Sequence, residues 1–460
     1  MVSQSLKQAF AGVVGNDNVM DAEVDKHSYS YDAAVLDPVL PSLVVRPTTM
    51  DAMGKVVKLC NDNGLPITVR GAGTNLSGGT IPSKGGVVLL TNALDKILEI
   101  NEEDMYAVVE TGAITAKFAA AVAAKGLFYP PDPGSQAAST LGGNVAENAG
   151  GLRGLKYGVT KDYVMGVNFF DVDGNYCKSG SRTVKCVTGL NIPQLMVGSE
   201  GTLAVMSEFI LKLVPPPQAS KAMMAIFPDV MTASRTVSAI IANKVVPCTL
   251  EFMDNFTIGA VEGYAKVGLP TDAGSLLLIE VDGHPVQVAE EAEKVEKICQ
   301  ENGCSRLQVA KDAVERNKVW EARRAALSSL ARLRPTTVLE DATVPRSKIP
   351  AMMEALGKIA KDYKLTIGTF GHAGDGNLHP TILCDRRDKE EFHRVEQGVD
   401  AIFQAALELG GTLSGEHGIG LAKSKYMELE TNKASVLYSK RVKAAVDPKN
   451  ILNPGKILGE

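Results

Sequence analysis

A run of three prolines, Pro215-Pro216-Pro217, constrains the fold of this chain more than any other feature. Neither a helix nor the interior of a sheet continues through consecutive prolines, because each ring removes a backbone donor and fixes φ. Such a run acts as an extended spacer. At 460 residues the chain is also too long for one simple core. We therefore expect separate domains on either side of this run.

The two sides of the proline run have different sequence textures. Before it, short strands are interrupted by glycine-rich loops, and the strands are expected at residues 42–46, 67–69, 86–91, 97–101, 106–111 and 202–214. Apolar residues at helical spacing predict a helix at residues 50–63. After it, strands alternate with helices, and the strands are expected at residues 223–227, 249–253, 276–281, 307–309, 365–370 and 378–384. The second pattern predicts an α+β layer, in which helices cover one face of an antiparallel sheet.

Composition excludes several classes of function. A hydrophobic content of 45%, a charged content of 22% and a net charge of -5 are ordinary for a globular protein and give no electrostatic footprint for nucleic acid. The seven cysteines contain no CxxC pair, which argues against a disulfide framework and against an iron–sulfur cluster in this chain. No signal peptide and no membrane-spanning segment are evident. We expect a cytoplasmic location.

Three of the six histidines stand in two glycine-punctuated loops, Gly371–His379 and Gly415–Gly418. His372, His379 and Glu416 form a ligand set that suits a divalent metal with an open coordination position. His417 is then left for proton transfer near neutral pH. A turn at residues 375–377 would bring the first two imidazoles together. The alternative is that these histidines only hydrogen-bond to loop backbone.

Two glycine-rich segments predict a bound phosphate or a long enclosed ligand. In residues 70–79 (RGAGTNLSGG) the glycines allow backbone amides to converge on a pyrophosphate. Their spacing is not the GxGxxG of a dinucleotide-binding Rossmann turn, which argues against a plain NAD fold. The second segment, residues 130–158, is too long for an idle loop. Ordinary loops are the alternative for both segments.

Taken together, these motifs resemble those of flavoproteins of the vanillyl-alcohol-oxidase superfamily, and within it the D-2-hydroxyacid dehydrogenase branch of D-lactate dehydrogenases and glycolate oxidases. The resemblance runs from Pro47 to Lys456. It implies an α+β fold with an FAD-binding domain in two subdomains (residues 1–217), a ferredoxin-like α+β cap that carries the substrate and metal site (218–430), and a C-terminal segment that returns to the FAD domain (431–460).

The resemblance also implies the residues that bind FAD. They lie in the two glycine-rich segments, in the Gly198–Thr202 stretch and near the C-terminus: Arg70, Gly71, Ala72, Gly73, Thr74, Asn75, Ser77, Gly78, Pro133, Gly134, Ser135, Thr140, Gly142, Gly143, Asn144, Asn148, Gly151, Glu200, Gly201, Asn453 and Lys456. Glu200 and Gly201 would lie near the adenosine, and Asn453 with Lys456 near the isoalloxazine. Covalent members of the superfamily often carry a histidine where Thr74 and Asn75 stand here, so non-covalent FAD is implied.

For the chemistry, the resemblance supports His372, His379 and Glu416 as ligands of Zn, Fe or Mn and His417 as the base. It adds Asn377 as a polar group on the substrate side and Arg323 as the partner of the substrate carboxylate. Arg323 lies three residues after Trp320, so the two share one face of a predicted helix. The alternatives are Arg324 as the carboxylate partner, and a solvated helix arginine with no such role.

The implied reaction is metal-assisted oxidation of a short D-2-hydroxy acid, D-lactate or glycolate, to the 2-oxo acid, with hydride transfer to the flavin. Where the 2-hydroxyglutarate enzymes that the chain resembles place polar groups for a second carboxylate, this chain has Leu327 and an apolar residue near Leu339, which favours a monocarboxylate. Electrons would leave to a separate iron–sulfur or electron-transferring flavoprotein subunit. Two other functions stay open: a metal-dependent hydrolase, and a catalytically idle FAD-binding subunit of a complex.

Overall fold

The structure, a computed structural model, describes residues 2–459 and divides into two compact units. Unit 1 comprises Met1–Gly150, Val159–Pro216 and Glu416–Glu460, and unit 2 comprises Gly151–Gly158 and Pro217–Gly415. Each unit is described by itself. The three-part domain division expected from the sequence stays a prediction.

Unit 1 begins with a four-stranded sheet in the order β1-β2-β4-β3. Its strands are β1 (Val19–Met20), β2 (Leu43–Val45), β3 (Ile67–Arg70) and β4 (Val87–Leu90), and β4 runs parallel to both β2 and β3. Helices α1 (Gln4–Val14) and α3 (Met50–Asp62) share its apolar core, and α2 (Glu23–Ser28) lies beside β2. Thr49 caps α3 by accepting a hydrogen bond from the Ala52 amide at 3.2 Å, so the helix begins where the apolar periodicity predicts.

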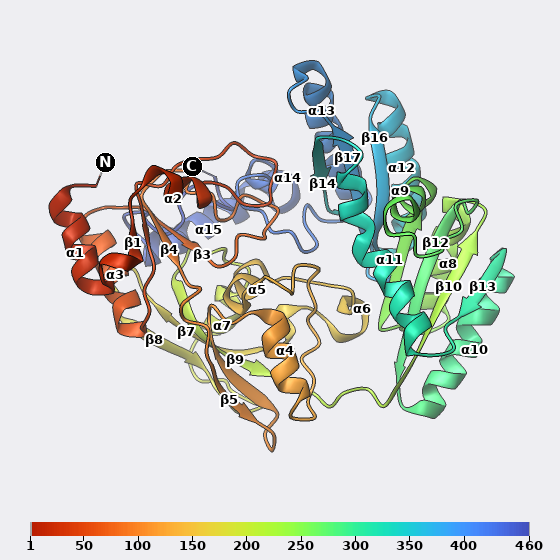
Figure 1. The fold of residues 1–460 in the computed structure, drawn as a ribbon, viewed down its shortest axis with the longest axis horizontal. Helices are drawn as coiled ribbons and strands as arrows, with labels where there is room; N and C mark the ends of the chain where they lie inside the picture. The colour runs from red at the N-terminus through yellow and green to blue at the C-terminus, as the bar shows by residue number, and fades with distance from the viewer. Residues whose placement is uncertain (1, 460) are drawn as a thin grey trace. The chain divides into compact units, whose positions relative to one another are not determined.

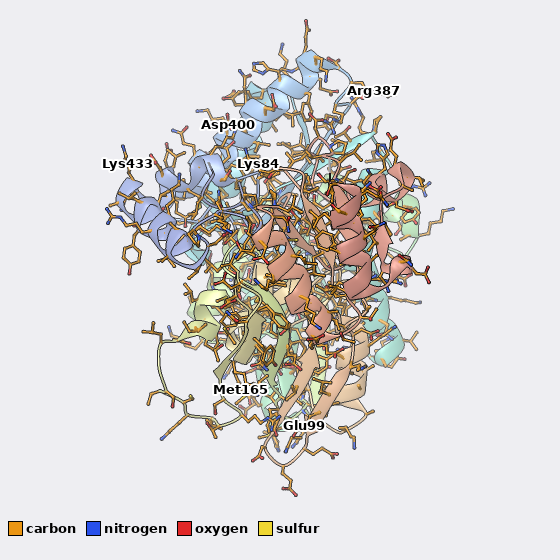
Figure 2. All side chains as sticks on the ribbon, turned by 90° about the vertical axis from the view of Figure 1, so that its left-hand side faces the viewer. Lys84, Glu99, Met165, Arg387, Asp400 and Lys433 are labelled. Atoms are coloured by element: carbon orange, nitrogen blue, oxygen red, sulfur yellow. The ribbon has the colours of Figure 1, made fainter. Side chains whose placement is uncertain are left out.

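A second, antiparallel sheet of unit 1 has the order β5-β6-β9-β7-β8. It contains β5 (Ile97–Asn101), β6 (Tyr106–Glu110), β7 (Val164–Phe170), β8 (Tyr176–Gly180) and β9 (Val205–Lys212), and α4 (Thr115–Ala123), α5 (Leu141–Glu147) and α7 (Ile192–Met196) contribute to its core. α14 (Met427–Thr431) and α15 (Lys433–Val446) follow in the last part of unit 1, Glu416–Glu460. The loop after the edge strand β8 leaves Val184 and Val187 95% and 98% exposed, and in Figure 2 it projects beside the sheet that carries Met165.

Unit 2 is built on one antiparallel sheet with the order β13-β10-β12-β11-β16-β17-β14, and β15 pairs with β17. The strands are β10 (Ala219–Phe227), β11 (Thr249–Asp254), β12 (Ser275–Gly283), β13 (Arg306–Val309), β14 (Thr336–Leu339), β15 (Ala342–Thr343), β16 (Thr366–His372) and β17 (Asn377–Cys384). The expected antiparallel α+β layer is thereby confirmed.

Helices cover both faces of the unit 2 sheet, so the expectation of one covered face was wrong. One face packs against α8 (Val230–Ala242), α10 (Pro285–Glu301), α12 (Ile349–Asp362) and α13 (Lys389–Glu408), and the other against α9 (Asn255–Ala265) and α11 (Ala313–Ala331) (Figure 1). The physical reason is visible in β11, where Leu250 and Phe252 join the first core while Met253 joins the second. Strands buried on both sides are apolar at successive positions rather than alternating. α6 (Gly154–Tyr157) also belongs to this unit.

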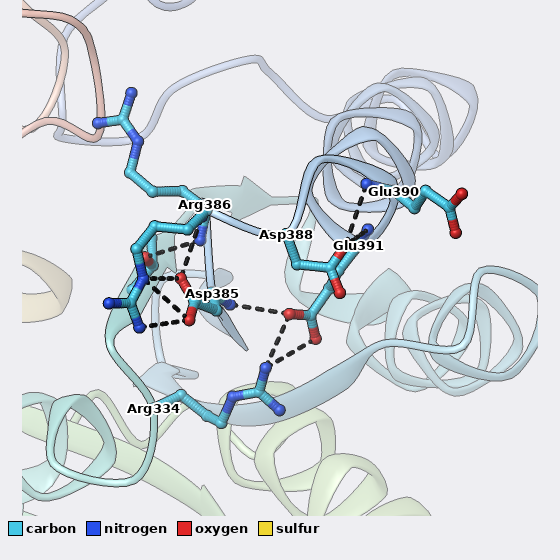
Figure 3. A network of polar contacts seen from close by, with 8 residues as sticks. Arg334, Asp385, Arg386, Asp388, Glu390 and Glu391 are labelled. Carbon is cyan, nitrogen blue, oxygen red and sulfur yellow. Dashed lines mark hydrogen bonds and ion pairs between the residues drawn. The ribbon is translucent and has the colours of Figure 1, made fainter.

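A polar network fixes the exit from β17 into α13 (Figure 3). The Asp388 side chain accepts hydrogen bonds from the amides of Glu390 at 3.1 Å and Glu391 at 3.0 Å, and so caps the helix. The Glu391 carboxylate in turn accepts from the Asp385 amide at 2.9 Å and from Arg334 at 2.7 Å. Because β17 carries one of the histidines, these bonds help to hold that strand in register. Over residues 2–459, no helix combines the length and the apolar composition that a bilayer span requires.

Candidate functional site

The loop after β3 presents a row of backbone donors in unit 1. Among residues 2–459, the amides from Gly71 to Gly79 find no acceptor. The loop is nevertheless held in place: Arg70 donates to the Tyr31 carbonyl at 2.6 Å, and Asn75 donates to Asp32 at 2.8 Å. Gly73 and Gly78 have φ of +70° and +79°, a region that favours glycine. Converging amides of this kind bind phosphate oxygens.

The structure packs the Gly71 backbone of the first glycine-rich segment against the Thr140 side chain of the second. A Cβ atom on Gly71 would lie 2.3 Å from Thr140 Oγ1, and one on Gly142 would lie 2.0 Å from Thr111 Oγ1. Thr140 caps α5, and its hydroxyl accepts a hydrogen bond from the Gly143 amide at 3.2 Å. Both glycines are therefore required by close approach, and Gly142 and Gly143 lie in the first turn of a helix.

The C-terminal segment closes against the same loop within unit 1. Asn453 donates to the carbonyls of Gly79 at 2.9 Å and Glu200 at 2.7 Å, and Lys456 donates to the Ile81 carbonyl at 2.6 Å. Burial lowers the pKa of Lys456 to about 8. Ser77 Oγ and Asn453 Oδ1 are buried without a partner among the described residues. Buried polar atoms in that state are normally satisfied by a ligand or by water, so the residues present fit the phosphates and polar edges of FAD.

Glu200 has a structural contact that the sequence does not reveal. Its carboxylate accepts hydrogen bonds from the amides of Ile419 at 2.7 Å and Gly420 at 2.8 Å, and so holds the backbone that follows His417. Burial raises the pKa of Glu200 to about 7. Glu147 lies close by, and burial together with the Glu200 charge raises its pKa well above the ordinary range. Glu200 and Gly201 both have positive φ, 50° and 70°.

The remaining predicted FAD residues lie in or beside these loops, and several are committed to the fold. Pro133, Gly134 and Ser135 form a turn in which Gly134 is exposed. Asn144 donates to Thr115 at 2.8 Å, and Asn148 ends α5 with φ 52° while accepting from the Lys161 amide at 2.9 Å. Gly151 belongs to unit 2. Ala72 and Thr74 lie inside the row of free amides, and Gly143 is the third residue of α5, after the cap Thr140.

In unit 2, His372 and His379 lie side by side on a β-hairpin. β16 and β17 pair so that Phe370 faces His379 and His372 faces Asn377, with a tight turn at residues 373–376. The two imidazole centroids are 5.1 Å apart and the rings are perpendicular, at 87°. Both side chains are buried.

Each of these histidines has a fully buried carboxylate behind it, which sequence reasoning missed. His372 Nδ1 lies 2.8 Å from Glu251 Oε1, and His379 Nδ1 lies 3.4 Å from Asp341 Oδ1. A metal-binding histidine typically donates its other ring nitrogen to a carboxylate. His372 is placed to do so, and this donor set therefore fits a divalent metal. The available signal was an acid inside the apolar strand Thr249–Asp254 (TLEFMD).

Arg323 shares Glu251 with His372. Its Nε donates to Glu251 Oε2, and its guanidinium carbon lies 4.8 Å from the centroid of the Phe370 ring. Burial alone would raise the pKa of Glu251, but His372 and Arg323 outweigh it and hold that pKa below its ordinary value. Arg324 is exposed, whereas Arg323 is buried, which favours Arg323 as the arginine of the site.

Helix α11 is itself anchored to the sheet through a second buried acid. Glu280 on β12 accepts from Trp320 Nε1 at 2.6 Å and from Arg316 Nε at 2.8 Å. Arg316, Trp320 and Arg323 are spaced by four and three residues, so they share one helix face. Two buried carboxylates therefore fix that face, and with it the position of Arg323.

The other predicted residues are divided between the units. Asn377 accepts from Thr343 Oγ1 at 2.9 Å, and a Cβ on Gly415 would lie 2.8 Å from its Nδ2, both within unit 2. Glu416 and His417 begin the last part of unit 1, Glu416–Glu460. There a Cβ on Gly150 would lie 2.6 Å from Glu416 Oε2, and His417 is 9% exposed. The full set of metal and catalytic residues stays a prediction.

Comparison with known proteins bears on both halves of the chain. Residues 41–180 match the FAD binding domain family, and residues 216–457 match the C-terminal domain of FAD linked oxidases. The chain is 48% identical over 460 residues to the glycolate oxidase subunit GlcD of Bacillus subtilis, covering 100% of this chain and 98% of the relative. It is 39% identical to GlcD of Escherichia coli K12 (90% and 83% covered) and 32% identical to a D-lactate dehydrogenase of Anaerostipes hadrus (99% and 98%).

Solved structures show the same fold at low identity. p-Cresol methylhydroxylase with bound substrate superposes with a TM-score of 0.81 at 17% identity, covering 100% of this chain and 98% of that one. 4-Ethylphenol oxidase from Gulosibacter chungangensis gives 0.80 at 16%, with coverage of 99% and 98%. The predicted α+β fold of the vanillyl-alcohol-oxidase type is confirmed. The chain belongs to the FAD linked oxidases and is an FAD-linked oxidoreductase of the glycolate oxidase and D-lactate dehydrogenase type.

Proposed function

We propose that this protein oxidises a short D-2-hydroxy acid, D-lactate or glycolate, to the 2-oxo acid, with non-covalent FAD and a divalent metal (Zn, Fe or Mn). The observation that carries the proposal is the buried group of unit 2 in which one carboxylate, Glu251, contacts both Arg323 and His372. An anion-binding arginine and a metal-binding histidine are thereby held at one point. The names of the relatives, glycolate oxidase subunit and D-lactate dehydrogenase, support the same substrate class.

Arg323 binds the substrate carboxylate. Its Nε is engaged by Glu251, and the two terminal nitrogens form the edge that pairs with a carboxylate in bidentate geometry. The Phe370 ring stacked against the guanidinium keeps it from swinging. One turn further along α11 stands Leu327, which offers no hydrogen bond to a second carboxylate. This residue supports a monocarboxylate as substrate.

His372, His379 and Glu416 hold the metal. Glu416 is joined directly to Gly415, whose backbone packs against Asn377 within unit 2, and this connectivity supports Glu416 as the third ligand. When bound, the metal polarises the substrate hydroxyl and FAD accepts the hydride from C2. His417 takes the hydroxyl proton, and Asn377 orients the substrate through its side-chain amide.

FAD binds in unit 1 between the glycine-rich segments. The row of amides from Gly71 to Gly79 supports the pyrophosphate, and Ser77 and Asn453 offer buried polar atoms. Thr74 and Asn75 stand where covalent members carry a histidine, which supports non-covalent attachment. The electrons pass to a separate iron–sulfur or electron-transferring flavoprotein subunit. Two of the relatives are named as subunits, which supports that arrangement.

The test is anaerobic bleaching of the flavin by D-lactate and by glycolate, followed by turnover with an artificial dye acceptor with and without a chelator. His417→Ala is expected to retain FAD but to lose turnover by at least about 100-fold, the usual contribution of a positioned base. His393→Ala is the matched control, because His393 lies on the exposed side of α13 beside Glu396.

Three outcomes would contradict the proposal. An absence of flavin absorbance would favour the hydrolase, and bound FAD that neither acid bleaches would favour the idle subunit. Near-normal turnover by His417→Ala would remove His417 from the role of base.

A further inference from the structure

Glu251 is the one fully buried acid on β11, and two cationic or metal-binding side chains converge on its carboxylate. Phe252 pairs with Gly371 across β11 and β16, which places Glu251 and His372 beside each other at the next position. Both then point to the face covered by α9 and α11, where Arg323 reaches them from the helix. The contact therefore follows from strand register and helix docking together.

The two oxygens of Glu251 have separate partners. Oε1 lies 2.8 Å from His372 Nδ1, and Oε2 accepts from Arg323 Nε. A carboxylate is an acceptor only, so the bond to His372 requires a hydrogen on Nδ1. The tautomer that carries it there leaves Nε2 as the ring nitrogen for a metal. The same carboxylate fixes the rotation of the guanidinium, and so the direction in which its terminal edge faces.

We infer that Glu251 is a positioning residue that orients the metal ligand His372 and the anion-binding Arg323 at the same time. The inference rests on the proposed function and deepens it: substrate anchoring and metal binding depend on one carboxylate, whose two oxygens contact His372 and Arg323. Burying this charge between two partners is costly unless both bonds are made, and both are made here.

Glu251→Gln tests this because glutamine has one acceptor oxygen where glutamate has two. If the amide oxygen faces Arg323, the amide NH₂ faces His372 Nδ1, which must then accept, and the imidazole hydrogen moves to Nε2. That tautomer does not bind a metal through Nε2. Affinity for Zn²⁺ or Mn²⁺, measured by competition with a chelator, is expected to fall by about 10- to 100-fold. The KM for glycolate and D-lactate is expected to rise as Arg323 loosens.

Asp254→Asn is the matched control. Asp254 ends the same strand, and its carboxylate accepts from the amides of Thr257 at 2.8 Å and Thr369 at 2.7 Å rather than from His372 or Arg323. Asparagine also caps helices well. The metal affinity of Asp254→Asn is expected to equal that of the unsubstituted protein. If Glu251→Gln has the same metal affinity and the same KM as Asp254→Asn, the inference about Glu251 is overturned and the proposed function is not. Unsubstituted protein that takes up neither Zn²⁺ nor Mn²⁺ would overturn the metal part of the proposed function and the inference with it.

A second measurement needs no substitution at Glu251, so it can be made even if Glu251→Gln fails to fold. ¹⁵N-histidine NMR of the six-histidine protein, with the His372 signals assigned by their loss in His372→Gln, reports which ring nitrogen carries the hydrogen. We expect Nδ1 to be protonated and Nε2 to shift on addition of Zn²⁺. A hydrogen on Nε2 of His372, with no shift on Zn²⁺ addition, would overturn the inference.

Discussion

Gly71→Ala should weaken FAD binding through one identifiable collision. The added Cβ would lie 2.3 Å from Thr140 Oγ1, 3.2 Å from Cγ2 and 3.3 Å from Cβ of the same residue. Ordinary van der Waals contact begins at about 3.4 Å, so the loop of residues 70–79 and the start of α5 must separate by roughly 1 Å. Overpacking of this size costs about 1–3 kcal/mol. If the strain falls mainly on the FAD-bound state, the dissociation constant rises about 5- to 150-fold.

The assay is reconstitution of apoprotein followed by quenching of flavin fluorescence. Thr140→Ala removes the colliding hydroxyl and methyl at a cost of about 1 kcal/mol for the lost helix cap, so Gly71→Ala/Thr140→Ala should bind FAD more tightly than Gly71→Ala alone. Gly12→Ala is the control, since a Cβ there meets nothing within 4 Å. Wild-type affinity in Gly71→Ala, or no recovery in the double variant, would refute the proposed contact between the two segments.

Two further predictions concern buried acids. Trp320→Phe should lower stability by about 1.5–3 kcal/mol, because the 2.6 Å bond to the Glu280 carboxylate is lost. Calorimetry should show a fall in Tm larger than that of Arg316→Gln, because the Arg316 side chain is 39% exposed and glutamine can still donate to Glu280. Glu200, with its pKa raised to about 7 from 4.5, binds its proton more tightly when folded, so its contribution to stability is complete below pH 4.5 and is lost as pH rises through 7. Tm measured across that window should vary less with pH in Glu200→Gln, and an unchanged slope would contradict the assignment.

The positions of strands and helices were predictable from the sequence wherever local signals, such as apolar periodicity, caps and turn residues, determine them. The helix expected at residues 50–63 is α3 (Met50–Asp62), and the strand expected at residues 97–101 is β5 (Ile97–Asn101). Both have local causes, a cap for α3 and turn residues around β5. The coverage of the second sheet was not predictable in the same way. Whether Met253 meets a helix depends on where α9 and α11 dock, which is a tertiary property.

The site was partly visible in the sequence for the same reason. His372 and His379 stand out because a glycine-rich turn joins them, and a hairpin makes neighbours of residues seven apart. Glu251 does not stand out, because it is 121 residues from His372 and 72 from Arg323 along the chain. Strand register connects Glu251 to His372, and the docking of α11 connects it to Arg323. Gly142 and Gly143 in a helix also escaped prediction, since glycine disfavours helices and only the approach to Thr111 and the bond to Thr140 explain them.

Two buried acids of the unit 2 sheet, Glu251 and Glu280, position one face of helix α11. Buried ion pairs add little net stability compared with apolar packing, so Glu251 and Glu280 are poorly explained as contributions to folding alone. Glu280 fixes Arg316 and Trp320, and Glu251 fixes Arg323 on the same helix face. Since α11 is rigid over one turn, a displacement at Trp320 is transmitted to Arg323 three residues later. Substitutions at Glu280, which contacts neither histidine, should therefore raise the KM for the hydroxy acid while leaving metal affinity unchanged, whereas substitutions at Glu251 should change both.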